Sequence, residues 1–180
     1  SRLRPPLGAT LKADALSRAW QKRVMYFVVI ALFMLILPAA CIAAEYAWLH
    51  TSADLVALTG KWFAFWGVGM RLGLAGLRQA FNPAFTAQDI FEIEDARVHP
   101  IVRELGFANL ALALLGLLAL LPGWTMPAAV AGGLFFALAG WKHTGAIERN
   151  LTRTVAMVSD IFIALVLAGY VVATLLHVGG

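Results

Sequence analysis

The chain has 180 residues, of which 61% are hydrophobic and 13% charged, and its mean hydropathy is +0.80. This composition leaves too little polar surface for a water-soluble globular domain, so the sequence predicts an integral membrane protein. A net charge of +4 would suit a nucleic-acid ligand in a soluble protein, but here the basic residues alternate with apolar segments, and no nucleic-acid partner is expected.

Five apolar segments alternate with short polar connections. Each segment is close to the roughly 20 residues that cross about 30 Å of hydrocarbon. The sequence therefore predicts an all-α fold, with a single five-helix transmembrane domain over residues 24–180. The expected spans are Val24–Trp48, Leu55–Ala80, Leu105–Leu121, Met126–Trp141 and Thr154–His177.

The placement of Lys and Arg predicts the orientation of these spans. Basic residues precede the first span and accompany the connections after the second and fourth spans. The connections Glu45–Asp54 and Pro122–Pro127 and the C-terminal tail carry no Lys or Arg. The positive-inside rule then places the N-terminus in the cytoplasm and the C-terminus outside. Lys61 and Arg71 are exceptions, because both lie inside the second span.

Residues 1–23 are expected to form a cytoplasmic tail that carries an amphipathic helix. From Thr10 onward, apolar side chains such as Leu11 and Ala15 fall near one face, and Lys and Arg cover the rest. This pattern is typical of a helix that lies on an anionic membrane surface, although a helix that binds a partner protein would look the same.

Glycine and proline predict how the spans pack and end. The second span is rich in glycine (Gly67, Gly69, Gly73 and Gly76) and is expected at the centre of the bundle, because small residues let membrane helices approach closely. It should end at Asn82-Pro83, and a helix on the membrane surface is expected around residues 85–100, with Pro100 before the third span. The tight turn Leu121–Trp124 predicts an antiparallel hairpin of spans three and four.

Two ionisable residues inside the spans are the strongest pointers to function, because such residues are costly in a membrane and usually face the interior of the bundle. Arg71 lies about 15 Å from the cytoplasmic end of its span, and Asp160 about 10 Å from the same side, at 1.5 Å per residue. Both lie on stripes of small residues, which face neighbouring helices. The sequence therefore predicts an Arg71–Asp160 pair.

Further polar residues enter the same cytoplasmic half of the membrane. Glu104 and Asn109 come with the third span, His143 closes the fourth, and Arg149 and Asn150 lie in the next loop. A pocket of these side chains with Arg71 and Asp160 would open to the cytoplasm. Three interpretations remain open: a structural ion pair that fixes helix register, a site for a small polar ligand or lipid headgroup, and a path for protons or ions.

Cofactor and catalytic signatures are weak in this sequence. Glu92, Asp95 and His99 have helical spacing, but a single such triplet does not predict a metal site, and none is expected. His50 and His177 are the two histidines at matched depth, near the surface, and no haem is expected. The chain has no Gly-rich phosphate loop, Gly-x-Ser-x-Gly, Cys-x-x-Cys or His-Glu-x-x-His motif.

The stretch RLGLAGLRQAFNP (Arg71–Pro83) resembles the opening helix of DoxX-like membrane proteins. Three other stretches resemble an uncharacterised family of small prokaryotic membrane proteins more closely: Pro100–Gly116, Ala139–Asn150 and Val155–Asp160. These resemblances imply a four-helix core with the first span as an N-terminal addition, in a prokaryotic inner membrane. Some DoxX-like proteins resemble subunits of quinone-linked oxidoreductases, which implies a quinone or lipid as a candidate ligand.

The favoured hypothesis is a non-catalytic binding or accessory protein, either in a larger membrane complex or as a homo-oligomer. Its pocket would hold a lipid-like or quinone-like molecule, with Arg71 and Asp160 fixing the geometry. A second hypothesis is a small membrane enzyme acting on a lipid or quinone, with His143 or Glu104 as the acid–base group. A transporter is the third, and the lack of internal repeats disfavours it.

Overall fold

A computed structural model describes residues 20–21, 24–25, 27–48, 54–144 and 151–178 of the chain. These residues are helical almost throughout, and no strand occurs among them. The expected amphipathic helix of the N-terminal tail lies outside the described residues. Three helices in the described part are long and apolar enough to cross a membrane, which indicates a membrane protein: Phe27–Trp48, Ala96–Leu118 and Thr154–His177.

The first two long helices each contain a π-helical segment. In the first, η1 (Leu32–Ile36) leads directly into α2 (Leu37–Trp48). The second is built from α3 (Leu55–Phe63), η2 (Ala64–Arg71) and α4 (Leu72–Phe81). Its junction residues keep α-helical dihedrals, so residues 55–81 form one continuous helix.

Both ends of this second helix follow from local chemistry. Asp54 caps its N-terminus, where the side-chain Oδ1 accepts a hydrogen bond from the backbone N–H of Val56 at 2.8 Å. Its C-terminus lies at Asn82, as the sequence predicts, because Pro83 cannot continue the ladder. Asn82 in turn caps the next short helix by accepting a hydrogen bond from the Phe85 N–H.

The connection to the third long helix differs from the continuous surface helix expected around residues 85–100. A helical segment, α5 (Pro83–Phe85) with η3 (Thr86–Ile90), ends at Ile90, and Glu92 has a positive φ of 58°. A single turn, η4 (Ala96–Val98), then leads into α6 (His99–Leu118). Pro100 therefore lies in the first turn of α6 rather than before it, a position where the missing N–H costs nothing.

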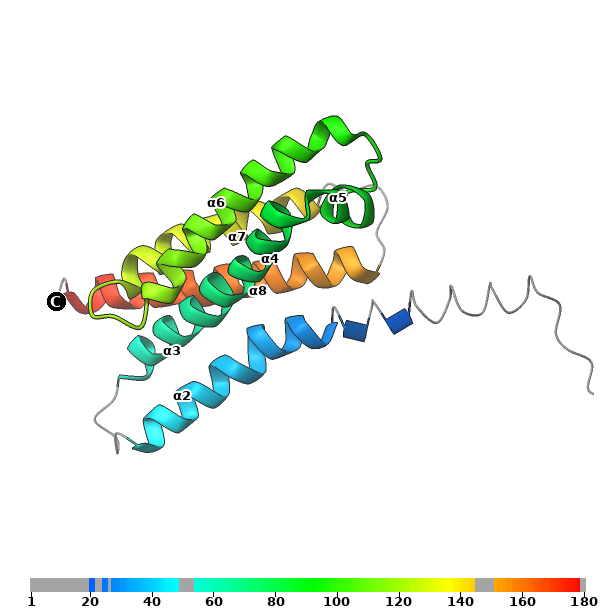
Figure 1. Cartoon of the computed structure of the whole chain (residues 1–180). Helices are drawn as coiled ribbons and strands as arrows, with labels where there is room; N and C mark the ends of the chain where they lie inside the picture. The colour runs from blue at the N-terminus through cyan, green and yellow to red at the C-terminus, as the bar shows by residue number, and fades with distance from the viewer. Residues whose placement is uncertain (1–19, 22–23, 26, 49–53, 145–150, 179–180) are drawn as a thin grey trace, which may run out of the picture.

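The last two long helices are α7 (Thr125–Thr144) and α8 (Leu151–Val178). Gly123, with a φ of 83°, lies in the turn between α6 and α7, and Thr125 Oγ1 donates to the Ala119 carbonyl across it. In Figure 1 successive long helices run in opposite directions, so α6 and α7 form the expected antiparallel hairpin.

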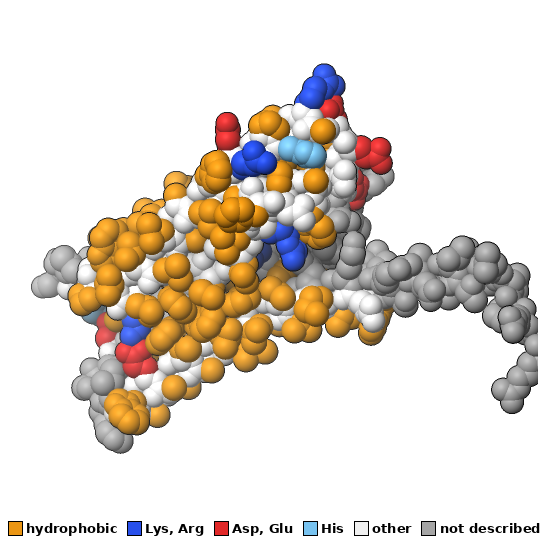
Figure 2. Space-filling view, viewed as in Figure 1, with side chains coloured by type: hydrophobic (Ala, Val, Ile, Leu, Met, Phe, Trp, Pro, Cys, Tyr) orange, Lys and Arg blue, Asp and Glu red, His pale blue; other side chains and the backbone are white. Residues whose placement is uncertain are grey.

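The bundle has a packed core and one peripheral helix. The helix of residues 55–81 packs along α6, and α7 packs along α8. The first helix lies at the edge and contacts chiefly α3 and η2 (Figure 1). Only 11% of its apolar window is buried, against 28% in each of the other two candidate spans. The outer face of the bundle is largely apolar, and charged side chains gather toward its ends (Figure 2).

Glycine determines how closely the core helices approach. A Cβ added at Gly116 would lie 2.1 Å from the Gly69 backbone nitrogen, and one added at Gly106 would lie 2.7 Å from the Ala80 nitrogen. A Cβ at Gly76 would in turn meet the Gly106 carbonyl oxygen at 2.9 Å. The central position expected for the Gly-rich helix is confirmed, because η2 and α4 lie in backbone contact with α6 at these glycines.

Replacing Gly116 by Ala should destabilise the protein, because backbone atoms of η2 occupy the space of the new methyl group. We expect a loss of about 1–3 kcal/mol, which thermal unfolding of the purified protein in detergent would show as a lower Tm. Gly169→Ala is the matched control, since nothing lies within 4 Å of its added Cβ. Equal Tm values for the two variants would contradict the close approach of η2 and α6.

Candidate functional site

An ion pair joins the second long helix to α8 in the interior of the bundle. Arg71 Nη2 lies 2.7 Å from Asp160 Oδ1, and the two side chains are 19% and 7% exposed. Arg71 ends η2, and Asp160 lies nine residues into α8 from Leu151. The pair predicted from the matched depth of the two residues is present in the structure.

Neighbouring side chains hold the Arg71 guanidinium from three further directions. Nη2 donates to Ser159 Oγ at 3.4 Å, and Nη1 donates to Met34 Sδ at 3.8 Å. The Phe136 ring of α7 lies 5.1 Å from the guanidinium carbon, within the range of a cation–π contact. Met34 and Phe136 are each 2% exposed, so apolar groups cover the charged pair.

The helix geometry around Arg71 departs from the ordinary α-helix. Arg71 lies at the end of the eight-residue π-helical segment η2, and Met34 lies in the π-helical segment η1 that packs against it. A π-helical turn has one extra residue per hydrogen-bonded ring, so it rotates the following side chains relative to an α-helix. Such turns are rare and frequent at functional sites. The segment therefore marks Arg71 independently of its charge.

Asn109, predicted to belong to the same pocket, has a different partner. Its Nδ2 donates to Gln79 Oε1 at 2.7 Å, and its buried Oδ1 has no hydrogen-bond partner among the described residues. Gln79 lies eight residues beyond Arg71 on the same helix, about 12 Å along its axis. The structure thus separates two polar contacts that the sequence places in one pocket.

The other predicted pocket residues do not join the Arg71–Asp160 contact within the described structure. Glu104 is exposed on α6, and none of the hydrogen bonds that Arg71 makes within the described residues reaches it. The side chain of His143 and the residues Arg149 and Asn150 lie outside the described part of the chain. The described core of the candidate site is therefore Arg71, Ser159 and Asp160.

The acidic connection before α6 is not arranged as a metal site. Asp95 accepts hydrogen bonds from the backbone N–H and the guanidinium of Arg97, and these bonds hold the pKa of Asp95 below its ordinary value. Glu92 and His99 lie on different segments, not along one helix face. Among the residues that the structure describes, no group of three His, Cys, Asp or Glu side chains is placed to hold a metal ion.

A second polar contact, which the sequence analysis missed, joins the first and second long helices near their connection. Lys61 Nζ pairs with Glu45 Oε1, and Trp62 Nε1 donates to Glu45 Oε2 at 2.8 Å. The Lys61 and Glu45 side chains are about one-quarter exposed. Glu45 lies within the predicted first span Val24–Trp48 as well as in the predicted connection, so the depth comparison that pairs Arg71 with Asp160 also applies to Glu45 and Lys61.

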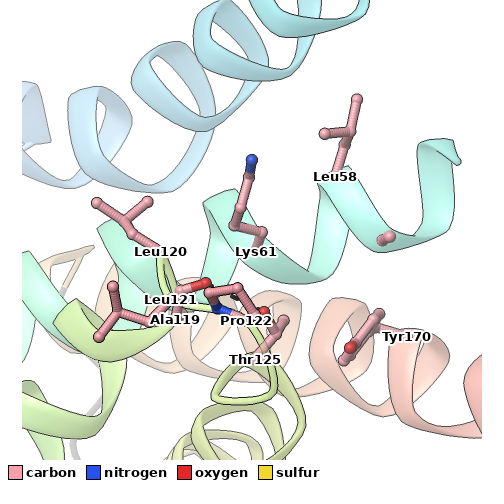
Figure 3. Close-up of a pocket in the computed structure, with 9 residues that line it drawn as sticks. Leu58, Lys61, Ala119, Leu120, Leu121, Pro122, Thr125 and Tyr170 are labelled. Atoms are coloured by element: carbon pink, nitrogen blue, oxygen red, sulfur yellow. Dashed lines mark hydrogen bonds between the residues drawn. The ribbon is translucent and has the colours of Figure 1, made fainter. Parts of the chain in front are cut away.

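One described cavity lies beside this second pair. Its volume is about 260 Å³, and it opens between α3, the α6–α7 turn and α8. The polar side chains in its wall are Lys61, Thr125 and Tyr170, and the rest of the lining is apolar (Figure 3). It therefore lies at the opposite end of the bundle from the pocket that the sequence predicts around the cytoplasmic connections.

The comparison with protein families matches residues 25–177 to a family of unknown function, DUF6790. The chain belongs to the DUF6790 family. The match begins in the first long helix and reaches the end of α8, so the peripheral helix and the core together form the family's shared unit. No curated protein matches the chain. No solved structure matches it either.

Replacing one residue of the buried Arg71–Asp160 pair should lower the stability of the protein more than replacing both residues. Arg71→Met leaves the Asp160 carboxylate without its cation, and we expect a loss of about 3–5 kcal/mol. The double variant Arg71→Met/Asp160→Leu should recover much of this loss, because no buried charge remains. Thermal unfolding in detergent would measure both effects.

The Glu45–Lys61 pair provides the control for this comparison. Lys61→Met should cost about 1 kcal/mol or less, since both side chains reach solvent. If Arg71→Met/Asp160→Leu loses as much stability as Arg71→Met and Asp160→Leu added together, Arg71 and Asp160 are not energetically coupled.

Proposed function

We propose that this protein is a non-catalytic binding or accessory protein whose buried Arg71–Ser159–Asp160 site holds the polar head of a lipid-like or quinone-like molecule. The observation that carries the proposal is the guanidinium itself, placed between apolar helices with its charge balanced by Asp160. An Arg inside a membrane bundle is costly, and such residues usually mark a path or a binding site.

The hydrogen-bonding capacity of Arg71 supports a ligand. A guanidinium carries five N–H donors in a planar fork. Within the described part of the chain, Arg71 donates to Asp160, to Ser159 at the long distance of 3.4 Å, and to a thioether sulfur, which is a weak acceptor. A carbonyl, quinone or phosphate oxygen would be a stronger acceptor than either of the last two.

The covering side chains support an apolar tail on that ligand. Met34 is unbranched and polarisable, so it can change rotamer, and a ligand oxygen would then replace its sulfur as the acceptor for Arg71 Nη1. It belongs to the least buried of the three candidate spans. A molecule from the bilayer would reach Arg71 by displacing Met34, which requires no opening of the packed core helices.

The membrane topology is part of the same proposal. The helix of residues 55–81 and α7 are long enough to cross a bilayer but less hydropathic than the candidate spans, since the first carries Lys61, Arg71 and Arg78 and the second is rich in small residues. Their antiparallel packing between the candidate spans supports five crossings, and the Lys and Arg distribution supports a cytoplasmic N-terminus. The prokaryotic inner membrane is what the sequence resemblances imply, and it belongs to the same proposal. A distant DoxX-like relationship and a larger complex or homo-oligomer belong to this proposal as well.

The enzyme hypothesis receives less support from the geometry. Glu104 is exposed rather than directed at the ion pair, and no described acid–base group other than Asp160 lies in contact with Arg71. Asp160 is itself paired with the Arg71 guanidinium at 2.7 Å. A transporter likewise gains no support from this arrangement.

Native mass spectrometry of the gently purified protein would test the binding proposal. We expect a stoichiometric amphiphile on the wild-type chain and its loss from Arg71→Lys, because Lys keeps the charge and the Asp160 pair but lacks the planar fork of donors. Lys61→Arg is the matched control and should retain the amphiphile. Equal occupancy in both variants, or folded wild-type protein that carries and accepts no amphiphile, would overturn the proposal.

A further inference from the structure

The cavity at the far end of the bundle has the properties of a second binding site, distinct from the Arg71–Asp160 site. It measures about 260 Å³, somewhat below the roughly 300–1,000 Å³ of typical small-molecule pockets, which suits a stretch of hydrocarbon chain. Its wall comes from three separate parts of the fold: α3, the α6–α7 turn and the C-terminal half of α8.

The lining has no uncompensated charge among the described residues. Six of its nine members are Ala, Leu or Pro. Thr125 Oγ1 already donates to the Ala119 carbonyl. The Lys61 stem borders the cavity, while its ammonium points away from Thr125 and Tyr170 toward Glu45 (Figure 3). Burying a charged group here would leave it unpaired, so the cavity itself selects an uncharged apolar chain.

A glycine and a tyrosine keep the cavity wall in place. The Tyr170 ring occupies the space beside Gly60, where an added Cβ would lie 2.3 Å from Tyr170 Cδ2. The Tyr170 ring of α8 therefore packs directly on the α3 backbone at Gly60. Leu120 and Leu121 on the opposite side are about half exposed, which leaves the cavity open toward the lipid.

The charged groups at the rim of the cavity determine which polar headgroup a lipid bound there by an apolar chain would carry. Lys61 and Glu45 form a net-neutral pair, each about one-quarter exposed, with Trp62 donating to the same carboxylate. Helix 55–81 is about 40 Å long at 1.5 Å per residue, close to a whole bilayer with its headgroups. Lys61 then lies about 9 Å from the helix end, at the boundary of headgroups and hydrocarbon. This placement rests on the five-span topology of the proposed function, but not on its ligand site.

We propose that this cavity binds one acyl chain of a phosphoethanolamine lipid from the leaflet opposite the charged connections. The lipid phosphate accepts a hydrogen bond from the Lys61 ammonium, and the lipid ammonium donates to the Glu45 carboxylate. A net-negative head would add a negative charge to the net-neutral Lys61–Glu45 pair that no ammonium of its own balances. A choline head would be neutral but would have no N–H to donate.

Native mass spectrometry of the full chain in neutral detergent would test this site by titration with phosphatidylethanolamine and phosphatidylglycerol of identical acyl chains. We expect phosphatidylethanolamine to bind roughly tenfold more tightly, the effect of one charge-assisted hydrogen bond. The double variant Lys61→Gln/Glu45→Gln should remove this preference and retain weaker binding of both lipids. Equal binding of the two lipids to the wild type, or a preference for phosphatidylglycerol, would overturn the proposal.

Variants that fill the cavity test whether the acyl chain of the lipid lies there. Ala57→Trp places an indole at an exposed wall residue, and we expect at least a tenfold loss of phosphatidylethanolamine affinity. Ala111→Trp, at an exposed alanine of α6 outside the cavity, is the matched control and should bind as the wild type does. Leu121→Trp fills the same cavity from the α6–α7 turn and serves if Ala57→Trp does not fold.

Indistinguishable affinities of the cavity-filling and control variants would place the lipid elsewhere. Arg71→Lys separates this proposal from the proposed function, because it should leave phosphatidylethanolamine binding unchanged while it removes the ligand of the central site. Loss of phosphatidylethanolamine from Arg71→Lys would assign that lipid to the Arg71 site and overturn the cavity proposal.

Discussion

A charge between apolar helices has to be paired, and this requirement organises the structure. Arg71 and Lys61 lie on one helix, and each has its carboxylate partner on a different neighbour: Asp160 of α8 and Glu45 of α2. The apolar side chains of these helices do not require helix packing, because lipid can cover them as well. The buried Arg71–Asp160 pair instead fixes the register at which the second long helix meets α8, because an unpaired charge in hydrocarbon costs more than any single apolar contact provides. The partly exposed Lys61–Glu45 pair makes the corresponding but weaker contact with α2.

Glycine supplies the second constraint on the same helix. The backbone contacts at Gly69–Gly116 and Gly76–Gly106 bring η2 and α4 against α6, while the ion pairs connect the helix to α8 and α2. One helix thus contacts three neighbours through two different kinds of interaction. Between lipid-exposed helices the hydrophobic effect contributes little, so close packing and paired polar groups carry the specificity.

The two candidate sites lie on this same helix, at different depths and with different chemistry. In the central site, Met34 and Phe136 cover the Arg71 guanidinium, which among the described residues has one carboxylate acceptor and two weaker ones. The cavity near Lys61 has an apolar lining and a neutral charged pair at its rim. The first is suited to the polar head of an amphiphile, and the second to an apolar chain. Membership of DUF6790 covers both sites, since the matched residues 25–177 contain every residue involved.

The sequence by itself determined the all-helical class, the helix end at Asn82, the central Gly-rich helix and the Arg71–Asp160 pair. Each of these follows from local composition or from depth along a straight helix, which needs no knowledge of the fold. The sequence could not determine that Asn109 contacts Gln79 rather than Arg71, because depth alone does not specify the rotation of a helix about its axis. The π-helical turns of η1 and η2 change that rotation without any proline or glycine signal unique to them. The cavity beside Tyr170 was decided by tertiary structure alone, since three segments distant in sequence form its wall, and the space between them depends on how their side chains pack.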